Sequence, residues 1–211
     1  MSKPRSPYTV IGLLLTLGLG SLPYPVWDNE YAGPLHMVGN EAIYWALVAL
    51  VVLYVLRIEK RPLASIGIRP MAGRDWPIAI GFAAIMIVGI GTILLVVLPA
   101  IGLDEHKQIN HLQSAPVWWL VISVIRAGVS EEVLFRGYPI ERLQAWTGSR
   151  TVAVLIPLVI FAGAHVGPWG WGHLLVAGFG GAVLTLQYLW RRNLLANMLT
   201  HCIVDMVGVF A

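Results

Sequence analysis

Long apolar runs are the feature that most constrains the fold of this chain. Each run is close to the length of roughly 20 residues that a helix needs to cross the hydrocarbon core of a bilayer. Inside a bilayer the backbone must satisfy its own hydrogen bonds, which a helix does. The sequence therefore predicts an all-α fold, a polytopic transmembrane helical bundle of about seven spans. We place the spans at Tyr8–Leu22, Glu41–Leu56, Trp76–Leu103, Pro116–Phe135, Thr151–His165, Trp171–Trp190 and Leu194–Ala211.

The composition also indicates a membrane protein. Of the 211 residues, 57% are hydrophobic and 12% are charged, whereas soluble domains carry about 25% charged residues. We expect residues 1–211 to form a single integral membrane domain in contact with the lipid bilayer. The Lys and Arg residues are scattered between the apolar runs and form no basic patch, which argues against nucleic acid as a partner. The lone Cys202 excludes an internal disulfide.

The positions of the basic residues predict an orientation. They precede the first span and fill every second connection after it, whereas the other connections are mainly acidic or uncharged. Cytoplasmic loops of membrane proteins carry such an excess of positive charge. We therefore predict a multi-pass protein of the cell membrane with a cytoplasmic N-terminus. The basic residues on the predicted cytoplasmic side are Lys3, Arg5, Arg57, Lys60, Arg61, Arg69, Arg74, Arg142, Arg150, Arg191 and Arg192.

Some ionisable residues lie in or near the predicted spans, where the energetic cost of a charge requires an explanation. A charge at the centre of a membrane helix costs about 2.5–3.5 kcal/mol, so such residues usually face a cavity and are paired. We regard them as the candidates for function. They are Arg126, Glu131, Glu132, Arg136, His165, His173, His201 and Asp205.

The segment VSEEVLFRGYP brings two adjacent acids and an arginine into an apolar chain. Glu132 and Arg136 are four residues apart with the acid first, the order that favours an ion pair on one helix face. Glu131 points about 100° away from Glu132, so it can look into the bundle as a general base. The alternative is that all three residues form only a salt-bridge cluster at a helix end.

Histidines lie in two further spans. The segment FAGAH ends one span at His165, and HCIVD places His201 and Asp205 one helical turn apart. A lone histidine on an apolar helix is more often a hydrogen-bonded packing residue. Three spans that carry Glu, His and His-x-x-x-Asp weaken that interpretation together. His173 follows a tryptophan-rich turn, and we expect it at the membrane interface.

Together these segments resemble the motifs of the CPBP intramembrane proteases, also called the CAAX-protease or Abi family. The family motifs are Glu-Glu-x-x-x-Arg, Phe-x-x-x-His and His-x-x-x-Asn/Asp, and this chain has EEVLFR, FAGAH and HCIVD in the same order. The resemblance implies a catalytic core over residues 116–211, in which Glu132 and Arg136 are a supporting pair. Residues 1–115 carry N-terminal spans without a matching motif.

The resemblance also implies an activity, that of an intramembrane endopeptidase. Its substrates would be membrane-associated proteins or peptides, either prenylated CAAX-type sequences or others. Glu131, with His165, would hold and deprotonate the attacking water, and His201 and Asp205 would stabilise the oxyanion. An ionised Asp205 only accepts hydrogen bonds, so it must be protonated there or must instead orient His201.

The residues leave several alternatives open. A water activated by Glu and His alone and a metal-bound water use the same ligand types, so the site has either no cofactor or a divalent metal such as zinc. The candidate metal ligands are Glu131, His165 and His201. A proton-coupled transporter also keeps intramembrane acids and histidines. A membrane scaffold or immunity protein would use the same cluster only to fix helix packing.

Helix lengths test whether these residues meet. With a rise of about 1.5 Å per residue, Glu131 and His201 reach similar depths, whereas His165 lies roughly 10 Å too far toward the outside. Either its helix starts below the bilayer surface, or the Gly167–Gly172 turn dips into the protein. We expect Glu131, Glu132, His165, His201 and Asp205 to line one cavity in the cytoplasmic half of the membrane.

Overall fold

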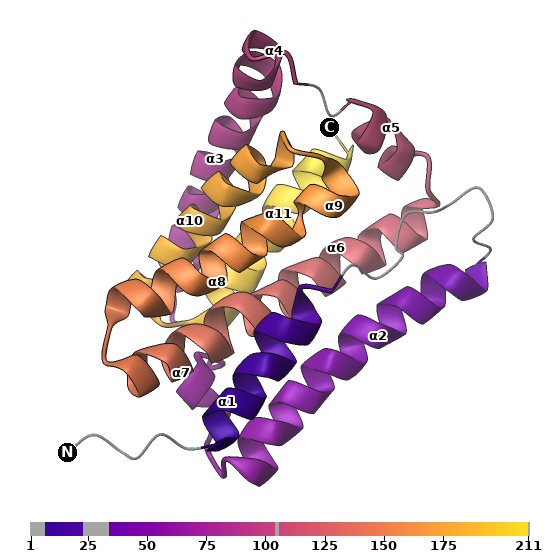
Figure 1. The fold of residues 1–211 in the computed structure, drawn as a ribbon. Coiled ribbons are helices and arrows are strands. Elements are labelled where there is room, and N and C mark those ends of the chain that lie inside the picture. Colours follow the sequence, from indigo (N-terminus) through magenta and orange to yellow (C-terminus); the bar gives the residue numbers. More distant parts are fainter. Residues whose placement is uncertain (1–6, 23–33, 104–105, 211) are drawn as a thin grey trace.

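A computed structural model describes residues 7–22, 34–103 and 106–210, and every regular element within these ranges is a helix (Figure 1). The predicted all-α fold is confirmed for this part of the chain. Lys3, Arg5 and Ala211, which entered the prediction of orientation and of the last span, lie outside the described residues.

The N-terminal half of the chain supplies the outer helices of the bundle. In Figure 1, α1 and α2 lie along one edge, and α3 lies behind α10. These elements are α1 (Pro7–Leu13) with the π-helical turn η1 (Leu14–Gly18), α2 (Pro34–Leu53) with the π-helical turn η2 (Tyr54–Ile58), the 3₁₀ turn η3 (Leu63–Ile66), α3 (Asp75–Thr92), the π-helical turn η4 (Ile93–Val97), α4 (Leu98–Ala100) and α5 (His106–Gln113).

The C-terminal half contains the elements with the three motifs. Here α8 packs against both α7 and α10, and α11 packs against α3 and α6. These elements are α6 (Val117–Glu131), the π-helical segment η5 (Glu132–Gly137), α7 (Tyr138–Thr147), α8 (Arg150–Ala164), α9 (Val166–Trp169), α10 (His173–Arg191) and α11 (Leu194–Phe210).

Four helical segments in the described residues are long and apolar enough to cross a membrane, fewer than the seven predicted spans. Two further apolar helices, Pro7–Gly18 and Leu194–Phe210, are shorter. The helix that begins at Val117 is not among the four, because three charges lie in its apolar part within two turns. The four segments are Glu41–Ile58, Asp75–Ala100, Arg150–Trp169 and His173–Arg191.

The surface of the bundle is apolar where a soluble protein would be polar. On α3 and its continuation η4, Ile80, Val88 and Leu95 expose 59%, 70% and 73% of their surface. Only 11% of the most apolar part of this segment is buried inside the protein. Such a surface requires an apolar surrounding, so these helices are those of a membrane protein.

The basic connections meet at one end of the bundle. Arg142 of α7 donates two hydrogen bonds to Glu59, which follows α2, at 2.9 and 2.6 Å. Arg191 at the end of α10 pairs with Asp75 at the start of α3 at 2.8 Å, and Arg192 pairs with Glu141. Connections that the charge pattern assigned to one side of the membrane therefore share one end. Which side of the membrane this end faces stays a prediction.

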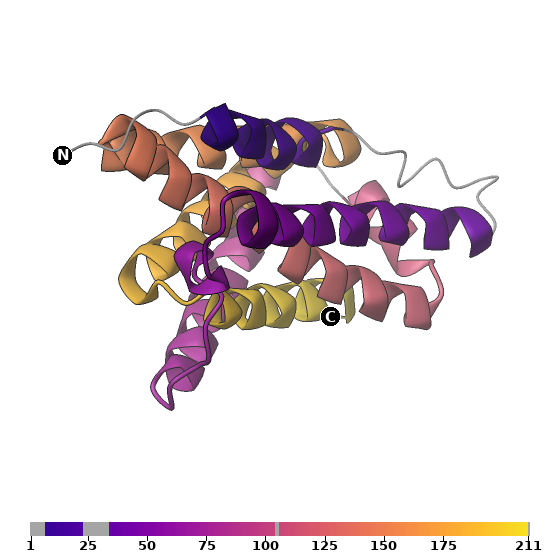
Figure 2. The ribbon, with the colours of Figure 1, turned by 90° about the horizontal axis from the view of Figure 1, so that it is seen from below.

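The helix that carries the two glutamates continues well past the predicted end of its span at Phe135. Elements α6, η5 and α7 follow one another without a break from Val117 to Thr147 (Figure 2). Glu131 thus lies roughly 24 Å from Thr147 along this helix. The helix α8 returns from Arg150 and reaches His165 after roughly 22 Å. These matching lengths bring His165 level with Glu131. The outward offset of His165 that the helix lengths predicted therefore arose because the predicted span was ended at Phe135, before the helix itself ends.

A similar match holds for α11. A Cβ atom on Gly137 would lie 2.7 Å from Cδ2 of Leu194, so η5 and the start of α11 touch at this level. From there, Glu131 lies about 9 Å along its helix and His201 about 10.5 Å along α11. The two side chains are therefore level, and both lie beside or on the half of α11 that is nearer the basic end.

Local sequence signals fix the turn between α7 and α8. Gly148 adopts a left-handed backbone with φ 72° and ends α7, as glycine does at helix C-termini. Ser149 then caps α8 by accepting a hydrogen bond from the Val152 amide at 3.3 Å. This short turn returns the chain to the bundle and thereby sets the height of His165.

Candidate active site

The two glutamates lie in different environments although they are neighbours in the sequence. Glu132 begins η5 and is fully buried, with Oε1 3.0 Å from Nη1 of Arg136. Asn197 of α11 donates to its other oxygen at 3.2 Å. Glu131 is the last residue of α6, and 17% of its side chain is exposed. The predicted pair of Glu132 and Arg136 is present, and Glu131 is left to face a cavity.

His201 connects the acidic residues of the site. Its Nδ1 lies 2.9 Å from Oε1 of Glu132, and its Nε2 lies 3.4 Å from Oδ2 of Asp205. The same Nε2 is 3.7 Å from Oε2 of Glu131. Because ionised carboxylates only accept hydrogen bonds, an imidazole between them carries hydrogen on both nitrogens. The geometry thus favours His201 as an imidazolium and a hydrogen-bond donor.

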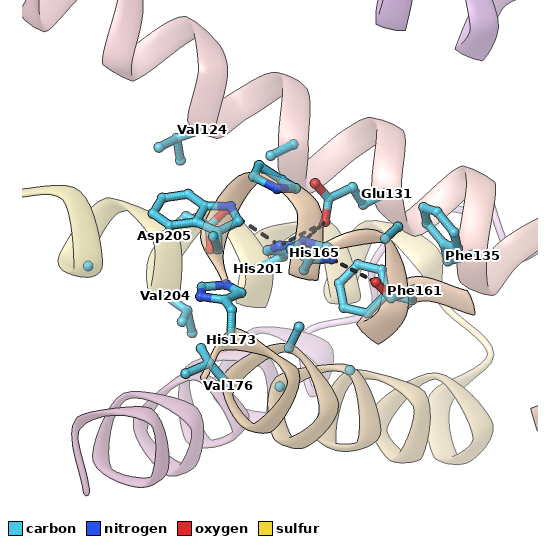
Figure 3. A pocket seen from close by; sticks show the side chains of 18 of the residues that line it. Val124, Glu131, Phe135, Phe161, His165, His173, Val176, His201, Val204 and Asp205 are labelled. Atoms are coloured by element: carbon cyan, nitrogen blue, oxygen red, sulfur yellow. Dashed lines mark hydrogen bonds and ion pairs between the residues drawn. The ribbon is translucent and has the colours of Figure 1, made fainter. Parts of the chain in front are cut away.

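His165 is oriented by its own helix. Its Nδ1 lies 2.7 Å from the carbonyl oxygen of Phe161, one turn earlier on α8. A carbonyl only accepts, so Nδ1 carries the hydrogen, and Nε2 of a neutral ring keeps a lone pair. This Nε2 lies 3.9 Å from Oε2 of Glu131. Figure 3 shows the side chains of Glu131, His165 and His201 pointing toward one another.

The spacing between these groups suits a bridging water. Separations of 3.7 and 3.9 Å from Oε2 of Glu131 to the two histidine nitrogens are too long for direct hydrogen bonds. They match two atoms that both contact one water molecule. This spacing agrees with the expectation that Glu131 and His165 hold one water between them. The structure brings all the predicted site residues together at this point.

A cavity of about 610 Å³ adjoins the site. Glu131, His165, His201 and Asp205 line it, and most of the remaining lining is apolar. Glu132, which was also expected to line the cavity, is fully buried behind this wall in its contacts with Arg136, Asn197 and His201. The N-terminal helices also contribute, through Gly20, Ser21 and Leu22 after η1 and through Tyr44 of α2. The cavity therefore lies between the motif-bearing helices and the part of the chain without motifs.

Sequence reasoning missed two residues of the site. Asn197 lies one turn before His201 on the same face of α11, and it helps to hold Glu132. Its spacing of four residues from His201 was a usable signal. His173, expected at the membrane interface, instead lines the cavity and stacks on the ring of His165 with centroids 5.6 Å apart. No sequence signal predicted that stack, because α10 and the end of α8 meet only in the folded chain.

The predicted metal ligands do not fit a metal in this arrangement. The described residues contain no group of three or more His, Cys, Asp and Glu side chains arranged to hold an ion. Ligand atoms of a tetrahedral zinc lie about 3.3 Å apart, whereas the Glu131 oxygen lies 3.7 and 3.9 Å from the two histidine nitrogens. In addition, both nitrogens of His201 already face carboxylates.

Comparison with known proteins identifies the segment that carries this geometry. No curated protein and no solved structure matches the chain. Residues 113–207 match the family model described as type II CAAX prenyl endopeptidase Rce1-like. The match contains all three motifs, including the Asp205 that ends the last one. This segment is therefore similar to the Rce1-like type II CAAX prenyl endopeptidases, the kind of family that the resemblance of its motifs predicted.

Proposed function

We propose that the protein is an intramembrane endopeptidase of the cell membrane in which Glu131 activates the attacking water. The family match supports a protease, and the apolar helices place it in a membrane. The observation that carries the mechanism is the position of one carboxylate oxygen, Oε2 of Glu131. It lies 3.9 Å from Nε2 of His165 and 3.7 Å from Nε2 of His201, beside a cavity.

In the first step a water lies between Glu131 and His165. One hydrogen of the water is directed at the Glu131 carboxylate and the other at the lone pair of His165 Nε2. Glu131 takes its proton as the water oxygen bonds to the carbonyl carbon of the substrate peptide bond. The products of this step are a tetrahedral oxyanion and a protonated Glu131.

His201 and Asp205 act on the oxyanion in different ways. The Nε2–H of His201 is the donor, and its positive charge is balanced by Glu132 at Nδ1 and by Asp205. Before the oxyanion forms, Asp205 accepts the same Nε2–H and thereby orients the ring; as the oxyanion forms, this hydrogen is donated to it instead. Asp205 needs no hydrogen of its own, which removes the difficulty of an acceptor-only carboxylate at an oxyanion. Glu131 then returns its proton to the leaving amine, and the peptide bond breaks.

Glu132 and Arg136 support the site without touching the substrate. Arg136 neutralises the fully buried Glu132 and lies over the ring of Phe161, with its Cζ 4.0 Å from the ring centroid. Phe161 also supplies the carbonyl that orients His165. The pair thus connects the histidines of two motifs. The proposed substrates are membrane-associated peptides of the prenylated CAAX type, as the family name suggests.

The test is cleavage of a prenylated CAAX-type peptide by purified protein in detergent. Glu131→Gln keeps the shape of the side chain but removes the base, so we expect a loss of about 10²- to 10⁴-fold in rate. The variant should keep its thermal unfolding temperature. Full activity of Glu131→Gln would exclude Glu131 as the base.

Two additions to this assay separate the alternatives. Unchanged cleavage in the presence of a chelator would agree with a water held by protein side chains alone. Inhibition by the chelator that added zinc reverses would favour a metal-bound water. If the unchanged protein cleaved no peptide and Glu131→Gln blocked proton-coupled uptake of a solute, a transporter would replace the protease. A loss of stability on substitution without any activity to lose would favour a scaffold.

A further inference from the structure

A second charged group lines the cavity outside the three motifs. Arg126 lies on α6, one and a half turns before Glu131, and only 8% of its surface is exposed. It forms part of the cavity lining together with Glu131 and Asp205. Among the described residues that line the cavity, Arg126 is the only lysine or arginine. None of the steps proposed above uses this charge.

The guanidinium of Arg126 is held firmly on one side. Its Nε lies 3.3 and 3.5 Å from the two carboxylate oxygens of Glu41 on α2. Ser123 donates to the same carboxylate at 2.9 Å, and the ring of Tyr44 lies 4.4 Å from Cζ of Arg126. These contacts fix the position of the charge through a helix that carries no motif.

The other side of the guanidinium is left to the cavity, which Arg126 lines together with Asp205, whose charge acts on it without a hydrogen bond among the described contacts. No described residue accepts a hydrogen bond from Nη1 or Nη2 of Arg126, because Glu41 is engaged through Nε. If Arg126 served only to neutralise Glu41, we would expect its terminal N–H groups to donate to that carboxylate as well. The terminal nitrogens instead form a planar fork, which matches a second carboxylate.

The position of this fork relative to Glu131 limits what can bind it. Along α6 the two residues are separated by about 7.5 Å, and an extended peptide advances about 3.3 Å per residue. A peptide whose scissile bond lies at Glu131 would therefore bring a group two or three residues further on to Arg126. The only carboxylate that every peptide backbone carries is its C-terminal one.

We propose that Arg126, held by Glu41 and Tyr44, binds the free C-terminal carboxylate of the peptide substrate. The inference rests on the proposed peptidase function for the identity of the ligand. It makes Arg126 a specificity residue, since it selects peptides that end two or three residues after the scissile bond and disfavours internal segments of longer chains. The N-terminal helix α2 thereby takes part in substrate selection.

Binding measurements test this inference separately from catalysis. The probes are two dye-labelled S-farnesyl peptides with three residues after the cysteine, identical except that one ends in a carboxylate and the other in an amide. Both are titrated against Glu131→Gln protein in detergent, which binds without cleaving. We expect the carboxylate peptide to bind at least about 10-fold more tightly, as for a charge-assisted hydrogen bond.

The variant for comparison is Glu41→Gln/Arg126→Gln in the Glu131→Gln background. It removes the cation without leaving a buried carboxylate unpaired, so it should fold, and the ratio of the two affinities should fall to about one. Arg126→Lys keeps the charge but lacks the fork and should give an intermediate ratio.

Equal binding of the two peptides to Glu131→Gln protein, or no binding of either, would overturn the inference without needing any variant at Arg126. An unchanged ratio in the double variant would do the same. Cleavage by the unsubstituted protein reports on the proposed function alone. Preferential binding of the carboxylate without any cleavage would therefore leave Arg126 as the carboxylate site and remove the peptidase.

Discussion

His201 is the residue whose surroundings explain most of the proposed chemistry. It lies between Glu132 and Asp205 and faces Glu131, so a single imidazole contacts every acid of the two motifs at this point. A ring in this position holds a positive charge without a metal ion. The charge lies beside the place where an oxyanion would form.

The role of Asp205 can be tested by two substitutions. Asp205→Asn keeps an oxygen that accepts from His201 Nε2, so we expect kcat/KM to stay within about 10-fold of the parent value. Asp205→Ala leaves His201 without this partner and should lose more, through the reduced orientation of the ring. The measurement is kcat/KM for the prenylated peptide. A larger loss for Asp205→Asn than for Asp205→Ala would contradict an orienting role.

We expect the Glu132–Arg136 pair to contribute more to the stability of the fold than to substrate binding. Only 1% of the Arg136 side chain is exposed, so Glu132→Gln leaves a buried cation without its counter-charge. Breaking a buried pair in this way typically costs about 3–5 kcal/mol. Thermal unfolding in detergent should show a clearly lowered midpoint.

A partly exposed pair at the basic end provides the control for this prediction. In the pair of Glu141 and Arg192, 25% and 33% of the two side chains are exposed. Glu141→Gln should therefore cost less than Glu132→Gln, since exposed pairs contribute about 0–1 kcal/mol. Equal midpoints for the two variants would show that burial does not set the cost.

At the scale of the helices, the close contact of α6 with α11 positions the site. A Cβ on Gly128 would lie 2.4 Å from Sγ of Cys202 and 3.3 Å from the α11 backbone. Glycine at such contacts lets two membrane helices approach closely. Gly128 lies one turn before Glu131, and Cys202 directly follows His201. The distance between Glu131 and His201, the proposed base and oxyanion donor, is thus set beside this glycine.

Gly128→Ala should push the two helices apart and lower the free energy of unfolding by about 1–3 kcal/mol. It should also reduce peptide cleavage, because Glu131 and His201 separate. Gly163→Ala on α8 is the matched control, since nothing lies within 4 Å of its added Cβ. Gly128→Ala/Cys202→Ala should recover part of the loss, because the closest contact is with Sγ. Normal stability of Gly128→Ala would mean that the helices do not rely on this contact.

The motif residues could be predicted from sequence because each is an ionisable group in an apolar run, which is rare without a function. The end of the α6 helix could not be predicted in the same way. Gly137 and Pro139 look like a helix end, yet Pro139 lies in the first turn of α7, directly after η5. The π-helical hydrogen bonding of η5 carries the helix through this point. The polar residues beyond it are buried by partners from distant connections, such as Glu59 for Arg142.

The pairing of Arg126 with Glu41 lay outside sequence reasoning for a related reason. The two residues are far apart in the chain, and each alone looks like an isolated charge near a span. Their contact depends on how α2 packs on α6, which neither periodicity nor a motif specifies. The sequence of residues 1–115 therefore indicates no function, although residues of this part also line the cavity.

For the whole molecule, the untested prediction is its orientation. The described basic connections share one end, and we expect that end in the cytoplasm. In a Cys202→Ala background, Asn110→Cys on the exposed face of α5 should react with an impermeant maleimide on intact cells. Gly73→Cys, in an open position of the connection before α3, should react only after the cells are lysed. The reverse pattern would invert the orientation.

The cavity wall has one further consequence for the molecule as a whole. The proposed reacting groups come from α6, α8 and α11, whereas Gly20, Ser21, Leu22 and Tyr44 come from the part of the chain before the family match. In the proposed function, bond cleavage depends on residues 113–207, whereas substrate choice depends both on Arg126 in this segment and on the helices outside it that hold Arg126 and complete the cavity. Exchanging the first two helices between relatives should therefore change the preference for one peptide over another while the hydrolytic step stays the same.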